Sequence, residues 1–357
     1  MDKNLAIIIA GGTAGHIMPG LVVADILRKR GWEILWLGNH NRMEGHIVPA
    51  HGLEFSSINF NGIPNKKIIT LLTFPFRLIR SMILSWKIIS TKKPIVVIGM
   101  GGHVTIPACL VAFIKRIPIV IHEQNAIVGR ANNFLYRFAY QMLSGYPITK
   151  PLNVSFIGNP VRERFFEVPG PSLRYSVRDN KKLNLLILGG SLGSGDLNCL
   201  LPAALSLMPD ESRPIVTHQC GRNNLERLEK LYKNFDVRAN CLEFIEDMVT
   251  VLSEADLVIC RSGAITISEI TAIGVASLLI PFPKSIKNHQ LKNAEILSNS
   301  NAAWLKRQED LTPELLARWL LDLDRSKLRD MAIRAYSFSR RDSGNKIADI
   351  CDSLRSL

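Results

Sequence analysis

The chain alternates short apolar runs with longer stretches in which apolar residues recur at helical spacing. Short apolar runs are typical of buried β-strands, and the intervening pattern is typical of amphipathic helices. Because strands that alternate with helices form βαβ units, the first half of the chain predicts a parallel sheet. The strands expected there are Leu5–Ala10, Glu33–Leu37, Ile95–Ile98, Ile117–His122 and Tyr140–Leu143.

The first predicted helix, Leu21–Lys29, directly follows a glycine-rich turn. Pro19 is expected in its first turn, and Gly31 is expected to end it after a run of basic residues. This order of proline, basic residues and glycine matches the preferences of helix ends.

A second series of strands and helices begins after a polar, proline-containing stretch at residues 167–182. We expect strands at Leu183–Leu188, Pro214–His218, Leu242–Phe244, Asp256–Cys260 and Ala276–Pro281. Amphipathic helices at Thr312–Leu323, Ser326–Phe338 and Gly344–Leu357 end the chain. A domain boundary is predicted near Gly158–Arg164, because Gly-Asn-Pro resists helix. The length of 357 residues likewise favours two α/β domains.

Three glycine-rich loops each follow an apolar strand: GGTAGH at Gly11–His16, GMGGH at Gly99–His103 and GGSLGS at Gly189–Ser194. A strand that ends in glycines brings backbone N–H groups close to a phosphate, and the following helix N-terminus adds about half a positive charge. A single loop of this kind is also explained by a tight strand-to-helix turn. Three of them together favour a protein that binds anions with both halves.

The competing interpretation is a dinucleotide-binding Rossmann domain, whose fingerprint includes an acidic residue at the end of the second strand. Here that strand ends Trp36-Leu37-Gly38-Asn39, without an acid, and GGTAGH does not match GxGxxG. The dehydrogenase interpretation is therefore disfavoured.

Two further segments carry polar groups at the ends of predicted strands. HEQN at His122–Asn125 lies where open α/β sheets bind their ligands, although a solvated loop explains it too. Cys260-Arg261-Ser262-Gly263-Ala264 leads into a predicted helix that places Glu269 in its first turns. Glu269 there could bind a ribose diol or merely complement the helix dipole.

The ordered set of motifs resembles that of the MurG family of peptidoglycan glycosyltransferases, over nearly the whole chain. The matching segments are GGTAGHIMPG, GMGGH, HEQN, GNPVR, GGSLGS, FIEDM, CRSGAITISE and QLKNA. The resemblance implies a GT-B fold of class α/β, with two Rossmann-like domains whose parallel sheets face each other across a cleft. It implies an acceptor-binding and membrane-associating domain of residues 1–160 plus 341–357, and a UDP-GlcNAc-binding domain of residues 161–340.

The activity implied by the resemblance is an inverting transfer of GlcNAc from UDP-GlcNAc to the 4-hydroxyl of MurNAc in lipid I, undecaprenyl-pyrophosphoryl-MurNAc-pentapeptide, which forms lipid II. On the donor-sugar side the resemblance places Thr13, Ala14, Gly15 and Asn125. Around UDP it places Arg162, Ser191, Ile245, Ala264, Ile265, Thr266, Ile267, Ser268, Glu269 and Gln290. Arg162 suits a diphosphate, Ser191 supplies a hydroxyl donor, and the backbone of Ile245 could read the edge of uracil.

His16 is the candidate catalytic base, since an inverting transfer needs in-line attack by a deprotonated acceptor hydroxyl. The alternative is that His16 orients the acceptor diphosphate or caps the helix. The motif loops contain no DxD sequence, so we expect no cofactor and no strict need for a metal. Two positions depart from the family pattern: Ala14 replaces a glycine, which requires a negative φ or strain, and His103 replaces a tyrosine.

The formal net charge of +13 indicates an anionic partner. The chain contains no nucleic-acid-binding motif, so membrane surfaces and phosphates are favoured and no nucleic acid is expected. The six scattered cysteines and the short N-terminal apolar run predict a cytoplasmic protein with free thiols. With the family resemblance, this places the protein peripherally on the cytoplasmic face of the bacterial plasma (inner) membrane.

Residues 66–93 form an apolar segment in which Leu72, Phe76, Ile79, Ile83 and Trp86 are spaced to share one face of a helix after Pro75. Its charged residues leave uncharged stretches well short of the about 20 residues that span a bilayer. The basic residues and Trp86 favour an interfacial helix on anionic lipid. A helix that packs its apolar face on the sheet explains the same spacing.

Two other functions remain open from the sequence. A UDP-GlcNAc 2-epimerase or another UDP-sugar transferase would share the UDP-binding half, and GGTAGH and HEQN argue against it. A non-catalytic membrane scaffold would bind UDP without turnover.

Overall fold

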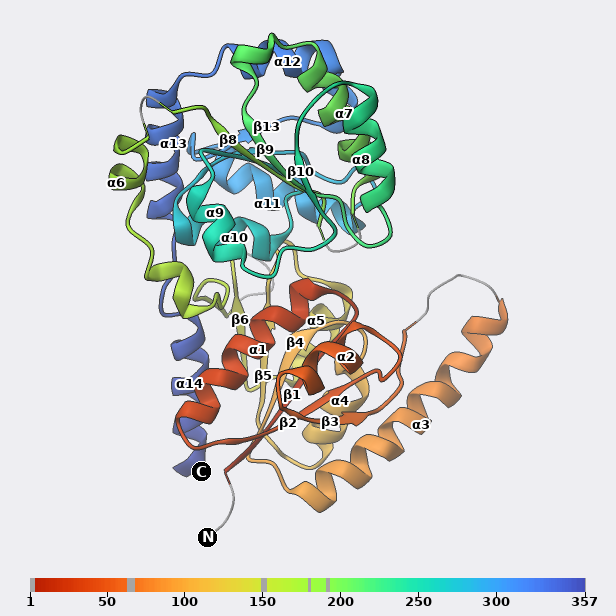
Figure 1. Ribbon diagram of the computed structural model, residues 1–357. Helices are drawn as coiled ribbons and strands as arrows, with labels where there is room; N and C mark the ends of the chain where they lie inside the picture. The colour runs from red at the N-terminus through yellow and green to blue at the C-terminus, as the bar shows by residue number, and fades with distance from the viewer. Residues whose placement is uncertain (1–3, 63–67, 149–152, 179–180, 191–192, 357) are drawn as a thin grey trace. The chain divides into compact units, whose positions relative to one another are not determined.

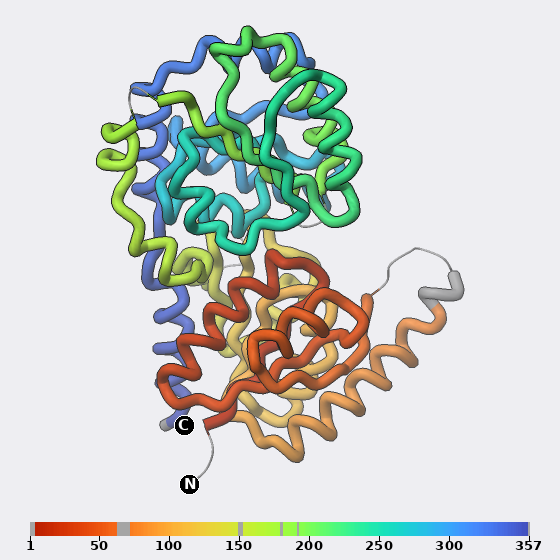
Figure 2. Tube along the Cα trace, viewed as in Figure 1, coloured from red at the N-terminus to blue at the C-terminus, as the bar shows by residue number. Residues whose placement is uncertain are grey.

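The computed structural model describes residues 4–62, 68–148, 153–178, 181–190 and 193–356, which form two compact units (Figures 1 and 2). Unit 1 contains the chain up to Val161 and returns from Arg340 onward. Unit 2 is Arg162–Ser339. The predicted pair of α/β domains, each with a parallel sheet, is confirmed.

Unit 1 is built on a seven-stranded parallel sheet with the order β3-β2-β1-β4-β5-β6-β7. The strands are β1 (Leu5–Ala10), β2 (Glu33–Gly38), β3 (Glu54–Ser57), β4 (Val96–Gly101), β5 (Ile119–Glu123), β6 (Gln141–Ser144) and β7 (Val154–Phe156). Its helices are α1 (Ala14–Lys29), α2 (Met43–Ala50), α3 (Ile68–Lys92), α4 (Thr105–Ile114), α5 (Arg130–Leu135) and α14 (Ser343–Ser353).

Strand β1 is apolar throughout because both faces of the sheet are covered. Ala6, Ile8 and Ala10 belong to a core cluster that α1 and α14 complete. Leu5, Ile7 and Ile9 point to the opposite cluster, which residues of α3, α4 and α5 complete. A central parallel strand therefore shows a continuous apolar run and no alternation.

The last helix, α14, lies beside α1 in unit 1, as the blue and red ribbons of Figure 1 show. Arg30 at the end of α1 donates hydrogen bonds to Asp349 (2.7 Å) and Asp352 (2.8 Å) of α14. Gly344 allows the close approach, since a Cβ there would lie 2.5 Å from Cδ1 of Ile26. The helix thus completes the core of the unit in which the chain begins.

Unit 2 has a six-stranded parallel sheet with the order β10-β9-β8-β11-β12-β13. Its strands are β8 (Asn184–Leu188), β9 (Ile215–Gln219), β10 (Asn240–Leu242), β11 (Leu257–Cys260), β12 (Ala276–Leu279) and β13 (Trp304–Leu305). Its helices are α6 (Pro171–Ser176), α7 (Gly195–Ser206), α8 (Leu225–Asn234), α9 (Met248–Glu254), α10 (Ala264–Ile273), α11 (His289–Ser298), α12 (Pro313–Leu321) and α13 (Arg325–Ser337).

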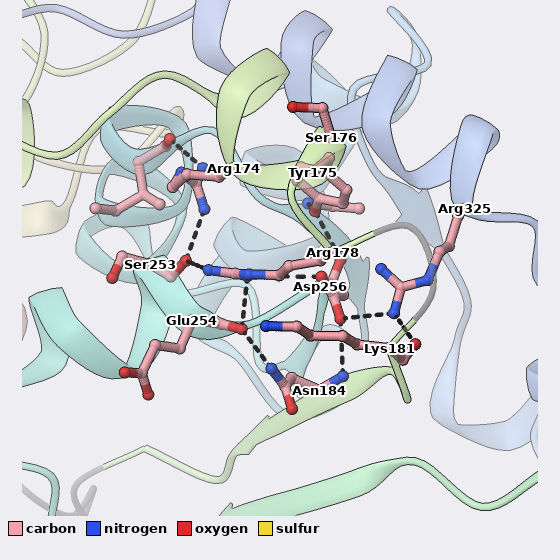
Figure 3. A network of polar contacts seen from close by, with 12 residues as sticks. Arg174, Tyr175, Ser176, Arg178, Lys181, Asn184, Ser253, Glu254, Asp256 and Arg325 are labelled. Carbon is pink, nitrogen blue, oxygen red and sulfur yellow. Dashed lines mark hydrogen bonds and ion pairs between the residues drawn. The ribbon is translucent and has the colours of Figure 1, made fainter.

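Helix α6 is fastened to unit 2 by the buried side chain of Arg174 (Figure 3). Its guanidinium donates to the carbonyls of Pro169 (2.9 Å), Ser253 (2.9 Å) and Ile273 (2.7 Å), and also to that of Gly274. Carbonyls at a helix C-terminus lack intrahelical partners, so one cation satisfies the ends of both α9 and α10. The first part of the polar stretch, residues 167–178, is therefore a structural part of unit 2.

Each sheet reverses its strand order once, between β1 and β4 in unit 1 and between β8 and β11 in unit 2. Open α/β sheets bind ligands at the carboxyl ends of strands beside such a point. GGTAGH and GGSLGS directly follow β1 and β8, whereas GMGGH and CRSGA begin in the last residues of β4 and β11. The motifs identified from the sequence therefore flank the two switch points.

Several predicted elements differ from the structure. Helix α1 begins at Ala14, so the prediction that Pro19 lies in its first turn is wrong. Strand β10 ends at Leu242, where the predicted strand began, and α3 continues through Pro75. The sequence did not predict β3, β7 and β13, which are short and hold half-exposed or exposed residues. Among the described residues, no helix combines the length and apolarity needed to cross a bilayer.

Candidate functional site

The first glycine loop joins β1 to α1 in unit 1. Gly12 takes the positive φ of the turn (93°), Thr13 is the N-cap, and Ala14 is the first helical residue. The alanine at position 14 therefore needs no left-handed backbone. Gly15 and His16 follow in the first turn, where His16 Nδ1 lies 3.1 Å from the carbonyl of Gly11.

The second glycine loop packs against the first. Gly101 (φ 109°) lies so close to His16 that a Cβ there would be 2.7 Å from Cδ2 of the imidazole. A Cβ at Gly102 would press on the carbonyl oxygen of Gly11. The glycines after β4 therefore permit close packing around His16, which is a different role from the phosphate binding expected for them.

His103, next in this loop, lies against Gly62, where an added Cβ would be 2.6 Å from its ring. Desolvation lowers the pKa of His103, and the positive charges of Arg130 and Arg42 nearby lower it further. This end of unit 1 is therefore electropositive and suited to an anion.

The HEQN motif is mostly interior, which excludes the solvated-loop alternative. Glu123 is buried, and its carboxylate accepts hydrogen bonds from Asn125 N (3.0 Å) and Asn125 Nδ2 (3.1 Å). It also accepts from Gly129 N (2.9 Å) and Asn132 Nδ2 (2.9 Å). Four donors compensate the buried charge. Glu123 thus fixes the loop that presents Asn125, a role that the sequence did not assign to it.

His122 is buried and holds the next part of the chain in place. Its Nε2–H donates to the carbonyl of Gly158 (2.9 Å), which leaves Nδ1 to accept from Gln124 Nε2 (3.1 Å). Burial lowers the pKa of His122 to about 4, so the ring is neutral near pH 7. His122, Glu123 and Gln124 are all buried, and Asn125 is the one residue of HEQN that is only half-buried.

In unit 2 the loop after β8 leads into α7, and Ser194 is the N-cap of that helix. Ser191 lies outside the described residues. The hydroxyl of Ser194 accepts hydrogen bonds from Arg261 Nε (3.1 Å) and Nη2 (2.8 Å). Arg261 also donates to Gln308 Oε1 (2.6 Å) and lies 3.4 Å from Asp196. This arginine ties the loop after β11 to the loop after β8, and its place in the CRSGA motif was the available sequence signal.

Helix α10 begins at Ala264, directly after the Gly263 cap, so its first turn points its N–H groups toward the end of the sheet. Ile265, Thr266 and Ser268 are half-buried, whereas Ile267 is buried in the core, which leaves only its backbone for a ligand. Desolvation raises the pKa of the half-buried Glu269 to about 7, and Arg162 opposes that rise.

Arg162 precedes the short helix Glu163–Phe166, which packs against α10. Its guanidinium lies 5.2 Å from the ring centroid of Phe165. Arg162 and Glu269 therefore interact electrostatically at α10, whose N-terminus follows β11. The combination suits a ligand that carries both a diphosphate and a diol.

Ile245 and Gln290 lie in other segments that follow strands of the unit 2 sheet. Ile245 is buried in the loop after β10. Gln290 lies in the first turn of α11, and its Oε1 accepts a hydrogen bond from Phe282 N (2.9 Å). With the amide oxygen so engaged, the Nε2 group is oriented to donate to a ligand.

Across the described parts of both units, no group of three or more His, Cys, Asp and Glu side chains is arranged to hold a metal ion. The six cysteines are free, and burial raises the pKa of Cys109, Cys260 and Cys351 to about 12. These thiols therefore remain protonated near pH 7.

Helix α3 presents an apolar face to solvent. Leu72, Phe76, Ile79, Ile83 and Trp86 are between 44 and 76% exposed. The buried face of α3 includes Ser81 and Ser85. The Ser81 hydroxyl donates to the carbonyl of Ile58 (2.9 Å), and the Ser85 hydroxyl donates to the carbonyl of Ser81 (2.8 Å). The alternative in which this apolar face packs on the sheet is therefore wrong.

The exposed apolar surface continues onto α4 and α5. Lys115 Nζ lies 4.0 Å above the ring of Trp86, and Phe113 beside it is half exposed. Phe138 contacts both Phe113 (5.0 Å between centroids) and Phe134 (5.5 Å). We call this surface, formed by the α3 stripe with Phe113, Ile114 and Phe134, the apolar face of unit 1.

Comparisons with known proteins place the chain among glycosyltransferases. Residues 6–144 match the glycosyltransferase family 28 N-terminal domain, and residues 184–352 match its C-terminal domain. The chain is 45% identical to the UDP-N-acetylglucosamine–N-acetylmuramyl-(pentapeptide) pyrophosphoryl-undecaprenol N-acetylglucosamine transferase of Bordetella pertussis, over 99% of this chain and 98% of that protein. It is 44% identical to the enzyme of the same name from Polynucleobacter asymbioticus, over 98% of each chain.

Solved structures of two other proteins are also similar to the chain. MurG from Acinetobacter baumannii is 31% identical and superposes with a TM-score of 0.84, over 98% of this chain and 99% of that one. The UDP-GlcNAc 2-epimerase of Neisseria meningitidis, 13% identical with a TM-score of 0.62 over 98% of this chain and all of that one, shares only the fold.

Proposed function

The chain belongs to the MurG family within glycosyltransferase family 28, and from this membership we propose that it transfers GlcNAc from UDP-GlcNAc to lipid I, forming lipid II for peptidoglycan synthesis. Relatives named for this transfer align over almost their whole length at 41–45% identity. The structural observation that carries the proposal is that Arg162 acts electrostatically on Glu269 of α10, a helix whose N-terminus follows β11 of unit 2. These groups suit the diphosphate and the ribose of a nucleotide sugar.

Unit 2 supplies the donor site in this proposal. The first turn of α10 and Arg162 bind the diphosphate, Glu269 accepts hydrogen bonds from the ribose hydroxyls, and the backbone of Ile245 reads uracil. Gln290 donates through Nε2 to a sugar hydroxyl, because Phe282 N–H already occupies its oxygen. Ser191, Ile265, Thr266, Ile267 and Ser268 remain candidate contacts from the same loops.

Unit 1 supplies the acceptor and donor-sugar contacts of Thr13, Ala14, Gly15 and Asn125, together with the base. The carbonyl of Gly11 only accepts hydrogen bonds, so Nδ1 of His16 carries the hydrogen and Nε2 keeps its lone pair. His16 Nε2 takes the proton of the MurNAc 4-hydroxyl as that oxygen attacks C1 of GlcNAc. The bond from C1 to the diphosphate oxygen breaks, and UDP leaves with the electron pair.

The charge that develops on UDP is stabilised by Arg162 and by the N–H groups of α10. These groups perform the role that a divalent cation has in other transferases, so no cofactor is required in this mechanism.

The apolar face of unit 1 docks on the membrane that carries lipid I. An exposed apolar stripe flanked by Arg80, Lys87 and Lys115 has the composition of an interfacial surface, and basic residues near anionic lipid contribute about 1 kcal/mol each. We place the protein peripherally on the cytoplasmic face of the inner membrane on this basis.

The transfer is tested with radiolabelled UDP-GlcNAc and a lipid I analogue. Label should appear in a product that contains both sugars, and Glu269→Ala should raise KM for UDP-GlcNAc more than it lowers kcat. UDP release with formation of ManNAc would identify an epimerase, and UDP binding without turnover would identify a scaffold. Either result contradicts the proposal.

Membrane docking is tested by co-sedimentation with vesicles of phosphatidylglycerol and phosphatidylethanolamine. Replacement of Phe76 and Ile83 by serine should release the protein, and high salt should weaken binding. The matched control replaces Leu315 and Leu321 by serine. Both leucines are exposed on α12 in unit 2, so this variant should bind vesicles as the wild type does. If the wild type, the variant and the control bind equally, and binding is insensitive to salt and anionic lipid, the proposal that this surface docks on the membrane is refuted.

A further inference from the structure

A buried carboxylate lies directly behind the first glycine loop. Glu44 of α2 is fully buried, and its Oε2 accepts a hydrogen bond from Gly12 N–H (3.2 Å). Its Oε1 accepts from Asn39 N–H (3.2 Å). A Cβ at Gly11 would collide with Oε1, and one at Gly38 would lie 2.8 Å from Cγ of Glu44. Gly11 and Gly38 therefore leave room for a carboxylate inside the protein.

The other side of the same peptide group holds His16. Gly12 N–H and Gly11 C=O belong to one planar amide, and the carbonyl oxygen accepts from His16 Nδ1–H (3.1 Å). Carboxylate, peptide and imidazole thus form one continuous chain of hydrogen bonds. Thr13 Oγ1, 3.5 Å from the same Nδ1, is the weaker neighbour of the ring.

We propose that Glu44 is the positioning residue of His16 and acts through the Gly11–Gly12 peptide. The negative charge on the N–H side polarises the amide, which makes its oxygen a stronger acceptor for Nδ1–H. The imidazole is thereby held in the tautomer whose Nε2 lone pair is available to the acceptor hydroxyl. No proton crosses the peptide. The inference rests on the proposed function, in which His16 is the base.

Two simpler roles for Glu44 fit the contacts less well. As an acid in the first turn of α2 it could complement the helix dipole, yet both of its recorded hydrogen bonds come from outside α2. As a space-filling residue it would need no charge, and burial of a carboxylate is costly unless donors compensate it. One of its two donors, Gly12 N–H, belongs to the loop that holds His16.

The test is the tautomer of His16, read from the ring ¹⁵N chemical shifts of the full chain, which has eight histidines. A His16→Gln variant assigns the signal. The wild type should be in the Nδ1–H form, and Glu44→Gln should shift His16 toward the Nε2–H form. We expect kcat to fall by about 10- to 100-fold, within the contribution of a positioned base. KM for UDP-GlcNAc should stay within about twofold, because the hydrogen bonds of Glu44 go to Gly12 and Asn39 and to none of the residues proposed to bind UDP-GlcNAc.

The matched control is Asp256→Asn, which removes a buried carboxylate from unit 2. It should lower stability without changing the His16 tautomer. If Glu44→Gln does not fold, two measurements on the wild type test the proposal. The first is the tautomer of His16. The second is the chemical shift of the Gly12 amide proton, which should lie downfield because this proton bonds a carboxylate. A wild-type His16 in the Nε2–H form would overturn the proposal.

Failure of the proposal and failure of the base assignment are distinguishable. An inactive His16→Ala beside an unchanged tautomer in Glu44→Gln would overturn the positioning role of Glu44 alone. Normal turnover of His16→Ala would remove the base role, whatever Glu44 does.

Discussion

Glu269 is predicted to lower the stability of the free protein at neutral pH. Its pKa is raised from the ordinary 4.5 to about 7 because burial disfavours the charged form. A carboxyl group whose pKa is higher in the folded than in the unfolded state stabilises the fold below pH 4.5. That contribution is lost as the pH rises through about 7. Glutamine cannot ionise, so the Glu269→Gln variant should keep this contribution to stability as the pH rises.

The magnitude follows from the two pKa values. At about 1.4 kcal/mol per pH unit, the difference between 4.5 and about 7 corresponds to about 3 kcal/mol. The side chain is only half-buried, and water screens part of this penalty, so we expect Glu269→Gln to be more stable than the wild type by about 1–3 kcal/mol at pH 8. The gain should disappear at pH 4.5.

The assay is thermal unfolding of both proteins at pH 8 and pH 4.5, without UDP. For a unit of this size each kcal/mol shifts the midpoint by about 2–4 °C. The same variant should bind UDP-GlcNAc more weakly, because a neutral amide is a poorer acceptor for the ribose diol than a carboxylate. A variant that is equally or less stable at pH 8, or that gains equally at both pH values, would refute the reasoning.

Three further predictions concern other parts of the molecule. Arg174→Met should destabilise unit 2 by about 3 kcal/mol in chemical unfolding, because the substitution leaves buried carbonyls without a donor. The control Arg318→Met, at an exposed position, should change the free energy of unfolding little. Gly101→Ala should lower kcat by at least about tenfold, because its Cβ would displace His16, the proposed base. Gly52→Ala also changes a residue with a positive φ, but it has no neighbour within 4 Å and should lose only stability. EDTA should leave the transfer rate unchanged, and strong inhibition reversed by a divalent cation would contradict the proposed stabilisation of UDP.

The strands at the centre of each sheet were predictable from the sequence because they are apolar over their whole length. Leu5–Ala10 was predicted with its observed bounds, since a buried parallel strand needs no particular neighbour to be recognised. The edge strands β3 and β7 were missed, because their short sequences EFSS and VSF resemble loops until a neighbouring strand pairs with them.

The site was predictable only in its outline. The motifs placed the loops at the ends of β1, β4, β8 and β11, because strand order and glycine turns are local features of the chain. Nothing in the sequence indicated that Glu123 would be the buried partner of Asn125, or that Arg261 would join two loops 67 residues apart. Such contacts depend on which strands become neighbours.

By itself, the sequence determined the two parallel sheets, the motif loops and the helical spacing of the apolar residues in α3. Only the tertiary structure decided which way that stripe faces, because spacing defines a face without saying what covers it. The same holds for the glycines of GGTAGH, which looked like a phosphate cradle. Gly11 of this loop packs against Glu44, and Gly101 of GMGGH packs against His16, so neither glycine can carry a side chain.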